Sequence, residues 1–284
     1  SVKIELTGYC NFKCNFCAHV QRLRTLDEMD QKFFERIVKE MREAGVQELG
    51  MFYLGESFLC SWLPEAIRYA KEDCGYPYTF LTTNGSLSTP TKVKACMEAG
   101  LDSLKFSFNY SDEEQFKEIT KVRGVFFHKM IENIKAAHAV REEGGYDCGL
   151  YASYIEYDGD QGERMKEALE DILPYVDDAY ALPLYNQAAL VENDEWSFVQ
   201  GNRGRLEAMR DPLPCWSIFT EGHISFDGKL SACCFDHDAR FDMGNLNELS
   251  FMDAWNSQKF QDLRQAHLAK CVDGTICEQC VAYT

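Results

Sequence analysis

Three cysteines stand close together near the start of the chain, in the stretch GYCNFKCNFCAHV that contains Cys10, Cys14 and Cys17. Three thiolates are one short of a closed tetrahedral metal site. One interpretation is a zinc ion whose fourth ligand is a residue such as His19. The other is an iron–sulfur cluster held by three thiolates, which leaves one iron open to an outside ligand. In that second case the missing cysteine marks a binding position.

Ten further cysteines follow, out of thirteen in the chain, and six of them gather between residues 215 and 280. The six are Cys215, Cys233, Cys234, Cys271, Cys277 and Cys280. The other four, Cys60, Cys74, Cys96 and Cys148, are scattered singly and are expected to be ordinary core residues. In a reducing compartment the thirteen are not expected to form disulfides, so the second gathering also needs a metal explanation.

Composition narrows the class of protein. The 284 residues are 45% hydrophobic, which indicates a globular protein with room for one large domain, alone or with a small one. No run of eighteen apolar residues and no signal-peptide pattern is present, so we expect a cytoplasmic protein with no membrane partner. The net charge of −17 disfavours nucleic acid. It would suit a cationic substrate such as an amino sugar, but a well-solvated surface is the favoured explanation.

The first 190 residues alternate short strand-like runs with amphipathic helical patterns. The expected strands are Val2–Leu6, Glu48–Leu54, Tyr78–Thr83, Ser103–Phe108, Leu150–Glu156 and Ala179–Leu184. The expected helices include 30–44, 126–140 and 162–173. The first of them places Phe33, Ile37 and Met41 on one stripe. Six βα units in succession predict an α/β fold with parallel strands, whose carboxyl ends gather where ligands bind.

We divide the chain into a region over 1–195, a linker over 196–214 and a small α+β module over 215–284. In the module, 216–219 and 223–226 flank a turn, Asp227-Gly228 signals a hairpin, and a final helix spans about 251–268.

The first cysteine stretch resembles the signature of the radical S-adenosylmethionine (SAM) superfamily, C-x3-C-x2-C with an aromatic residue before the last cysteine. Cys10, Cys14, Phe16 and Cys17 fit that signature. The resemblance implies a partial (β/α)6 barrel over residues 2 to about 190. It also implies a [4Fe–4S] cluster whose open iron chelates SAM, and whose electron cleaves the sulfonium to a 5′-deoxyadenosyl radical.

Further motifs follow successive strands in the order that the resemblance implies. Gly55 and Glu56 resemble the motif that meets the methionine amino group, although Ser57 stands where the family often has proline. Thr83 and Asn84, in the turn TTNG, would suit the ribose. Ser107 and Asn109 end the fourth strand, where the family places contacts to ribose or carboxylate. Each motif alone would be ordinary turn chemistry.

The later cysteines resemble the twitch module, a shortened relative of the SPASM domain that carries an auxiliary [4Fe–4S] cluster. The resemblance assigns four ligands, namely Cys215, Cys233, Cys277 and Cys280. Zinc bound by the same four is the alternative, and Cys271 could replace one of them.

Cys234 directly follows an expected ligand. On an extended segment adjacent side chains point to opposite sides, so Cys234 should not bind the same cluster as Cys233. Its thiol could donate a hydrogen atom, with Cys271 as second choice, or it could be inert. Asp236, Asp238 and His237 could serve as a proton acceptor, and Asp236 is our candidate.

The expected reaction begins when the radical removes a hydrogen atom from an unactivated carbon of the substrate. Two fates of the resulting substrate radical are then possible. Return of a hydrogen atom from Cys234 gives an epimerase, while loss of a second electron to an auxiliary cluster gives a dehydrogenase. The plan resembles aminocyclitol dehydrogenases and aminoglycoside epimerases, which implies a sugar or aminocyclitol substrate and an electron donor such as flavodoxin or ferredoxin. Modification of a ribosomal peptide is a third hypothesis, disfavoured because the first strand begins almost at Ser1. Amide groups in 182–187 could bind substrate hydroxyls.

Overall fold

A computed structural model describes residues 1–21, 25–157, 159–182, 184, 214–236, 240, 242–278 and 280. Several sequence predictions lie outside these residues. They are residues 196–213 of the linker, the candidate proton acceptors His237 and Asp238, and most of the expected amide segment, namely Pro183 and residues 185–187. No helix among the described residues is long and apolar enough to cross a membrane.

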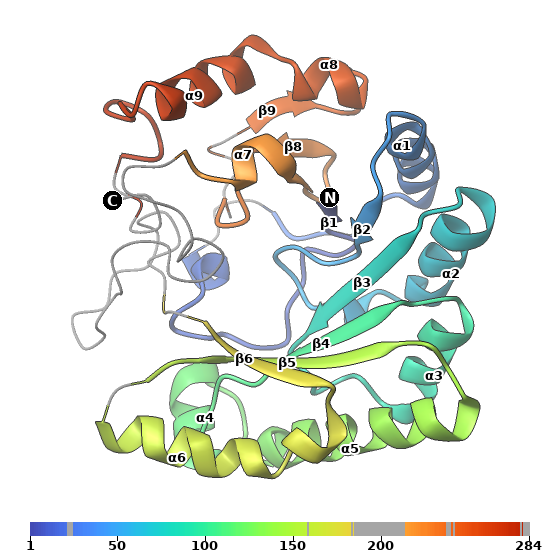
Figure 1. Cartoon of the computed structure of the whole chain (residues 1–284), viewed down its shortest axis with the longest axis vertical. Coiled ribbons are helices and arrows are strands. Elements are labelled where there is room, and N and C mark those ends of the chain that lie inside the picture. Colours follow the sequence, from blue (N-terminus) through green and yellow to red (C-terminus); the bar gives the residue numbers. More distant parts are fainter. Residues whose placement is uncertain are drawn as a thin grey trace.

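One curved sheet of nine strands organises the described chain, in the order β6-β5-β4-β3-β2-β1-β7-β8-β9 (Figure 1). The strands are β1 (Val2–Ile4), β2 (Glu48–Gly50), β3 (Tyr78–Thr83), β4 (Ser103–Ser107), β5 (Gly149–Ile155), β6 (Asp178–Leu182), β7 (Gly222–Ile224), β8 (Lys229–Ser231) and β9 (Asp242–Asn245). The first six pair in parallel, as predicted. The fold is therefore an α/β partial barrel with a small C-terminal antiparallel module.

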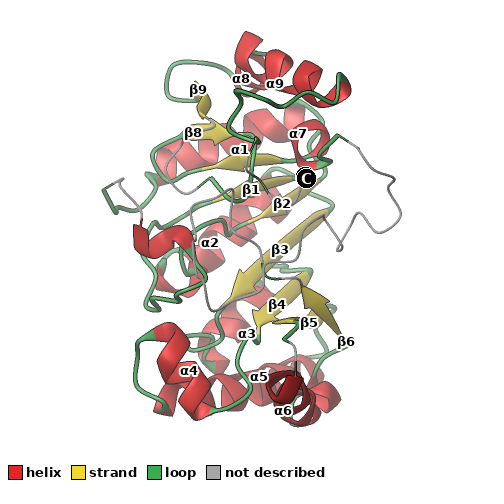
Figure 2. Cartoon of the chain, turned by 90° about the vertical axis from the view of Figure 1, so that its left-hand side faces the viewer, coloured by secondary structure: helices red, strands yellow, loops and turns green. Residues whose placement is uncertain are grey.

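Helical segments connect and follow the strands of this sheet. The longer ones are α1 (Gln31–Glu43), α2 (Leu63–Arg68), α3 (Pro90–Glu98), α4 (Glu113–Thr120), α5 (Val125–Gly144), α6 (Gly159–Glu170) and α9 (Gln258–Leu268). Shorter ones are α7 (Ser217–Thr220), α8 (Phe251–Trp255), η1 (Ala18–Gln21), η2 (Ser57–Leu59), η3 (Tyr69–Asp73) and η4 (Leu173–Tyr175). Figures 1 and 2 show α1, α2, α3, α5 and α6 along the convex side, with α8 and α9 beyond β9.

Helix α1 illustrates how the sequence produces these elements. The Asp30 carboxylate accepts a hydrogen bond from the Phe33 backbone N–H at 2.9 Å, which caps the helix. The buried stripe consists of Phe34, Ile37, Val38 and Met41. Phe33, which the sequence pattern placed on this stripe, is only half-buried, because the stripe is centred one residue later.

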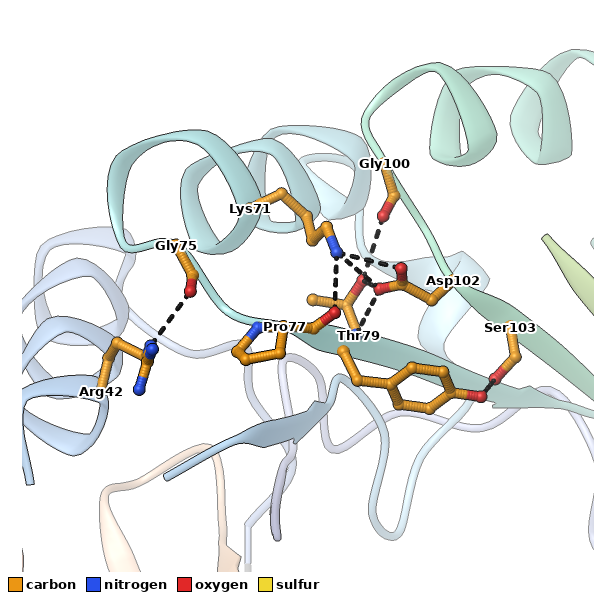
Figure 3. A network of polar contacts seen from close by, with 9 residues as sticks. Arg42, Lys71, Gly75, Pro77, Thr79, Gly100, Asp102 and Ser103 are labelled. Carbon is orange, nitrogen blue, oxygen red and sulfur yellow. Dashed lines mark hydrogen bonds and ion pairs between the residues drawn. The ribbon is translucent and has the colours of Figure 1, made fainter. Parts of the chain in front are cut away.

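The amino ends of the strands are joined by carboxylates that accept backbone hydrogen bonds. Asp102, just before β4, accepts hydrogen bonds from the Thr79 backbone N–H of β3 at 2.6 Å and from the Thr79 hydroxyl at 3.0 Å. Lys71 donates to the same carboxylate at 2.9 and 3.0 Å (Figure 3). Asp177, just before β6, repeats the arrangement with the Leu150 N–H of β5 and with Arg141. These contacts fix strand positions at the edge opposite to the strands' carboxyl ends.

The C-terminal module differs in detail from its prediction. Residues 217–220 form the short helix α7, and the expected final helix breaks at Asn256 and Ser257, because Ser257 caps α9. The predicted hairpin is confirmed, since β7 and β8 pair in antiparallel fashion around Asp227 and Gly228. Strand β7 also pairs in parallel with β1, with Lys3 opposite His223. The module thus continues the same sheet, which the sequence did not reveal.

Candidate active site

The loop that carries Cys10, Cys14 and Cys17 follows β1 and reaches across to α4. The Lys13 N–H donates to the Thr120 carbonyl, and the Asn15 N–H donates to the Ile119 carbonyl, both at 3.0 Å. Buried Phe12 packs edge-on against Phe116 at 5.3 Å. The three cysteines are therefore held by backbone hydrogen bonds and a buried aromatic anchor.

The three thiols are close enough to influence one another. Burial raises the pKa of Cys10 to about 12, with smaller contributions from Glu56 and Cys17. Burial also raises the pKa of Cys14, while a contact with Tyr110 acts in the opposite direction. Thiols in such surroundings become thiolates only when a cation replaces the proton. Three clustered thiols from one loop fit the anchoring of an iron–sulfur cluster with one open corner.

His19 does not complete this group in the way that the zinc interpretation requires. Its Nε2 lies 3.0 Å from the Gly8 carbonyl oxygen and is directed at the backbone. Among the residues that the structure describes, no three Cys, His, Asp or Glu side chains converge on one point as the ligands of a single ion would.

Gly55 and Glu56 follow β2 and lie against the chain just after β1. A Cβ atom at Gly55 would stand 2.2 Å from the Thr7 carbonyl oxygen and 2.7 Å from that of Tyr9, so only glycine allows this approach. The Glu56 N–H donates to the Tyr9 carbonyl at 2.8 Å. The sequence motif thus lies beside the cysteine loop.

The Glu56 carboxylate is buried and is held by the turn after β3. It accepts hydrogen bonds from the Thr83 hydroxyl at 2.7 Å, the Asn84 N–H at 2.8 Å and the Phe58 N–H at 3.1 Å. Burial raises the pKa of Glu56, and these donors lower it in part. The structure therefore brings Glu56, Thr83 and Asn84 together, as expected for residues at neighbouring strand ends.

A ring of amide and hydroxyl groups connects this turn to the cysteine loop. Asn84 Nδ2 donates to Asn11 Oδ1 at 2.9 Å, Asn11 Nδ2 donates to Ser86 Oγ at 2.8 Å, and Ser86 Oγ donates to Asn84 Oδ1 at 2.7 Å. The Asn84 side chain also interacts with the Cys10 thiol. The predicted ribose-binding turn and the predicted cluster loop are therefore one connected unit.

The end of β4 contributes the remaining predicted residues. Ser107 is the last residue of β4 and pairs with Ser153 of β5, and Asn109 follows two residues later. Both are half-buried, and the Asn109 carbonyl accepts a hydrogen bond from the Tyr157 hydroxyl at 2.9 Å. Phe16 stacks on Tyr110 with ring centroids 6.5 Å apart, so the β4 end and the cysteine loop are in contact.

The cysteines of the module also gather in space. The thiols of Cys233, Cys234 and Cys280 interact electrostatically with that of Cys215, and Cys280 also with that of Cys277. Burial raises the pKa of Cys215 to about 11 and of Cys277 to about 12. Five thiols thus share one region, which fits a second cluster. Cys271 is exposed.

Cys234 does not have the geometry that the sequence argument assumed. Residues 234 and 235 form a turn after β8, not an extended segment. The Cys234 thiol contacts the Cys233 thiol, and that contact, followed by burial, raises the pKa of Cys233. The inference that the two side chains must point to opposite sides is therefore wrong, because a turn does not alternate side chains. Cys234 is nevertheless exposed, whereas the other four are half-buried or buried.

Asp236 is fully buried and holds the same turn. Its Oδ2 accepts a hydrogen bond from the Ser231 hydroxyl, and its Oδ1 accepts one from the Arg240 N–H, both at 2.8 Å. The carboxylate therefore shapes the loop after Cys234, and its role as a proton acceptor stays a prediction.

Tyr53 joins the barrel to the second cysteine group. This residue precedes Gly55, and its hydroxyl lies 2.7 Å from the Cys233 carbonyl oxygen and 3.0 Å from that of Asp236. Its ring packs beside the buried His223 at 5.2 Å. The loop of the second cysteine group is thereby fixed to the segment that leads into the Gly-Glu motif.

Sequence reasoning missed Asn11, Ser86, Tyr53 and Tyr110. Asn11 and Ser86 could have been found because they adjoin the cysteine and TTNG motifs. Tyr53 and Tyr110 adjoin predicted strand ends, but nothing local reveals which distant group each hydroxyl meets.

Comparison with known families agrees with this arrangement. Residues 4–179 match the radical SAM superfamily, and residues 215–281 match the SPASM iron–sulfur cluster-binding domain. The chain therefore belongs to the radical SAM superfamily and carries a SPASM domain. Membership of that superfamily implies binding of SAM and a [4Fe–4S] cluster in the barrel, and the module matches an iron–sulfur cluster-binding domain.

Curated relatives resemble only part of the chain. A GTP 3′,8-cyclase of Chlorobaculum tepidum is 31% identical over 120 residues, which are 42% of this chain and 36% of the relative. A PqqA peptide cyclase of Granulibacter bethesdensis is 32% identical over 141 residues, which are 49% and 36% of the two chains. The matched region spans little more than a third of each relative.

Solved structures share the fold over nearly the whole chain. BtrN in complex with AdoMet and 2-DOIA has a TM-score of 0.61 at 16% identity, covering 94% of this chain and 85% of BtrN. Streptococcus suis SuiB bound to the precursor peptide SuiA scores 0.62 at 17% identity, covering 99% and 69%. AnSMEcpe with AdoMet scores 0.67 at 12% identity, covering 99% and 89%. At these identities the likeness establishes the fold.

Proposed function

We propose that this enzyme removes a hydrogen atom from a carbinol C–H of a carbohydrate or aminocyclitol and completes an epimerisation with Cys234 as hydrogen donor. One observation carries the proposal. Among the five thiols that gather in the module, Cys234 alone is exposed, and it lies against the thiol of Cys233. A donor must be reachable by substrate and must also be restored after each turnover.

The residues fall into three groups with different tasks. Cys10, Cys14 and Cys17 hold the [4Fe–4S] cluster that, with SAM bound, supplies the 5′-deoxyadenosyl radical. Phe16, Gly55, Glu56, Thr83, Asn84, Ser107 and Asn109 form the pocket for SAM. Cys215, Cys233, Cys277 and Cys280 hold one auxiliary [4Fe–4S] cluster.

The hydrogen balance of the donor step is simple. The Cys234 S–H bond breaks and a new C–H bond forms on the opposite face of the substrate carbon, which leaves a thiyl radical. One electron and one proton restore the thiol. The electron comes from an external donor of the flavodoxin or ferredoxin class, and the proton comes from solvent or through Asp236.

Dehydrogenation of a secondary alcohol is the second candidate. It is favoured by the gathering of four other thiols, enough to hold every iron of an auxiliary cluster, which would then accept the second substrate electron. In that case Cys234 is dispensable, and the substrate loses two hydrogens.

The two candidates are separated by turnover in D2O with aminocyclitol and aminoglycoside substrates. Epimerisation places one solvent deuteron on the inverted carbon, whereas dehydrogenation gives a ketone two mass units lighter. Cys234→Ala is expected to abolish epimerisation while 5′-deoxyadenosine still forms, and Cys271→Ala, which removes another exposed thiol, is expected to retain it. Full turnover by Cys234→Ala, or turnover of a peptide but no sugar, would contradict the proposal.

A further inference from the structure

Tyr110 is a buried tyrosine whose hydroxyl meets the cysteine loop. It follows β4 by three residues and is only 2% exposed. Its ring is fixed by Phe16, which stacks nearly parallel at 25°, and by Phe116, which packs edge-on at a centroid distance of 4.9 Å. The ring has little freedom to rotate away.

This packing directs the Tyr110 hydroxyl at sulfur. The hydroxyl oxygen lies 3.1 Å from Cys14 Sγ, a hydrogen-bonding distance for a sulfur acceptor. In the thiol form either group can donate. Once Cys14 is bonded to iron its sulfur has no proton, so the Tyr110 O–H must then be the donor.

A hydrogen bond to a ligand sulfur changes the balance between the two redox states of a cluster. The reduced cluster carries one more negative charge, part of it on the ligand sulfurs, so it gains more from the donor than the oxidised cluster does. Hydrogen bonds to the sulfurs are accordingly among the factors that set iron–sulfur potentials.

We propose that Tyr110 is a positioning residue that donates a hydrogen bond to Cys14 and raises the reduction potential of the cluster in the barrel. The proposal rests on Cys14 being a ligand of that cluster. It gives the β4 end a role in electron acceptance, in addition to the contacts with SAM expected of Ser107 and Asn109.

The test compares Tyr110→Phe with Tyr76→Phe in anaerobically reconstituted protein. Each variant removes one buried phenol hydroxyl, but Tyr76 donates to the Val38 carbonyl. The cluster of interest is identified as the one whose electron paramagnetic resonance (EPR) signal changes when SAM is added. For Tyr110→Phe we expect its midpoint potential to fall by about 59 mV, a tenfold change in the one-electron reduction constant.

A second substitution moves the potential the other way. Replacing Tyr110 with 3-fluorotyrosine keeps the ring and makes the hydroxyl a stronger donor, so the potential is expected to rise above that of the unmodified protein. This arm decides the matter if Tyr110→Phe loads too little iron to be measured.

An unchanged potential in the loaded Tyr110→Phe protein, or equal shifts in both phenylalanine variants, would overturn the proposal. So would a fall in the potential of the fluorotyrosine protein. Failure of the underlying assignment gives a different result, because a Cys14→Ala protein would then retain the SAM-responsive signal.

Discussion

Asn84 and Asn11 are joined by a hydrogen bond of 2.9 Å between side chains that stand 73 positions apart in the chain. Asn11 lies inside the cysteine motif, and Asn84 lies in the turn that holds Glu56. The bond therefore couples the geometry of the proposed SAM pocket to that of the cysteine loop.

Asn84→Asp removes the donating amide and places a carboxylate oxygen against the acceptor Asn11 Oδ1. Because the ring then contains two facing acceptors, we expect SAM affinity to fall at least tenfold while iron content stays near that of the unmodified protein. Equilibrium binding of SAM to the reconstituted protein measures this. The control is Asn256→Asp, where an amide that donates to the Met252 carbonyl is lost far from the site. Equal affinity in both variants would show that the ring does not shape the pocket.

Gly55→Ala tests the close approach of the Gly-Glu motif to the chain after β1. The added Cβ would meet two backbone oxygens, which cannot move as a side chain can, so we expect a loss of about 1–3 kcal/mol of stability and weaker SAM binding. Denaturant unfolding and SAM titration measure the two effects. Gly222→Ala is the comparison, because a Cβ there would meet only side-chain atoms, at 3.3 Å or more. Gly55→Ala should be the more damaging of the two.

Tyr53→Phe removes the hydroxyl that contacts the Cys233 and Asp236 carbonyls. The loss of one buried hydrogen bond should destabilise this turn by about 1 kcal/mol. We therefore expect a chelator to remove iron from the auxiliary cluster faster than in the unmodified protein. Release from the cluster in the barrel should be affected less. Tyr76→Phe removes a buried hydroxyl that donates to the Val38 carbonyl, and it should leave the release rates unchanged. Identical rates in both variants would contradict a link between Tyr53 and the auxiliary cluster.

Asp102→Ala tests the carboxylates at the amino ends of the strands. Lys71 and the Thr79 N–H lose their acceptor, so we expect a loss of about 2 kcal/mol of stability. SAM affinity should not change, because Asp102 lies at the amino ends of the strands, opposite to the strand ends that carry Glu56 and Asn84. Urea unfolding and SAM titration distinguish these outcomes. A selective loss of SAM binding with normal stability would be inconsistent with this role.

Three of the four scattered cysteines, those that are buried, should be inert in the native protein. Burial raises the pKa of Cys60, Cys96 and Cys148 to about 12, so near pH 8 almost no thiolate exists at these positions. Unfolding returns the thiols to a pKa of about 8.5. Mass spectrometry after iodoacetamide treatment at pH 8 is expected to find these three unmodified in the folded protein and modified in urea. Rapid labelling of the native thiols would show that they are not core residues.

The parallel strands and the first cysteine motif could be predicted from sequence because both are local. The run Tyr78–Thr83 is bounded by turn residues, and β3 spans those same residues. Contacts between distant segments could not be predicted in this way. Tyr53 and Cys233 are 180 positions apart, and no periodicity connects them. The error at Cys234 had a related cause, because the turn after β8 depends on Asp236 and on contacts with the barrel.

The pairing of β7 with β1 has a consequence for how the protein is made. Strand β1 is synthesised long before β7, so one of its edges stays uncovered until residues 222–224 have been made. An uncovered edge is a site where strands of other chains can add, so the nascent barrel needs protection until β7 is available. The residues of β1 therefore wait for a partner that lies more than two hundred positions further along the chain.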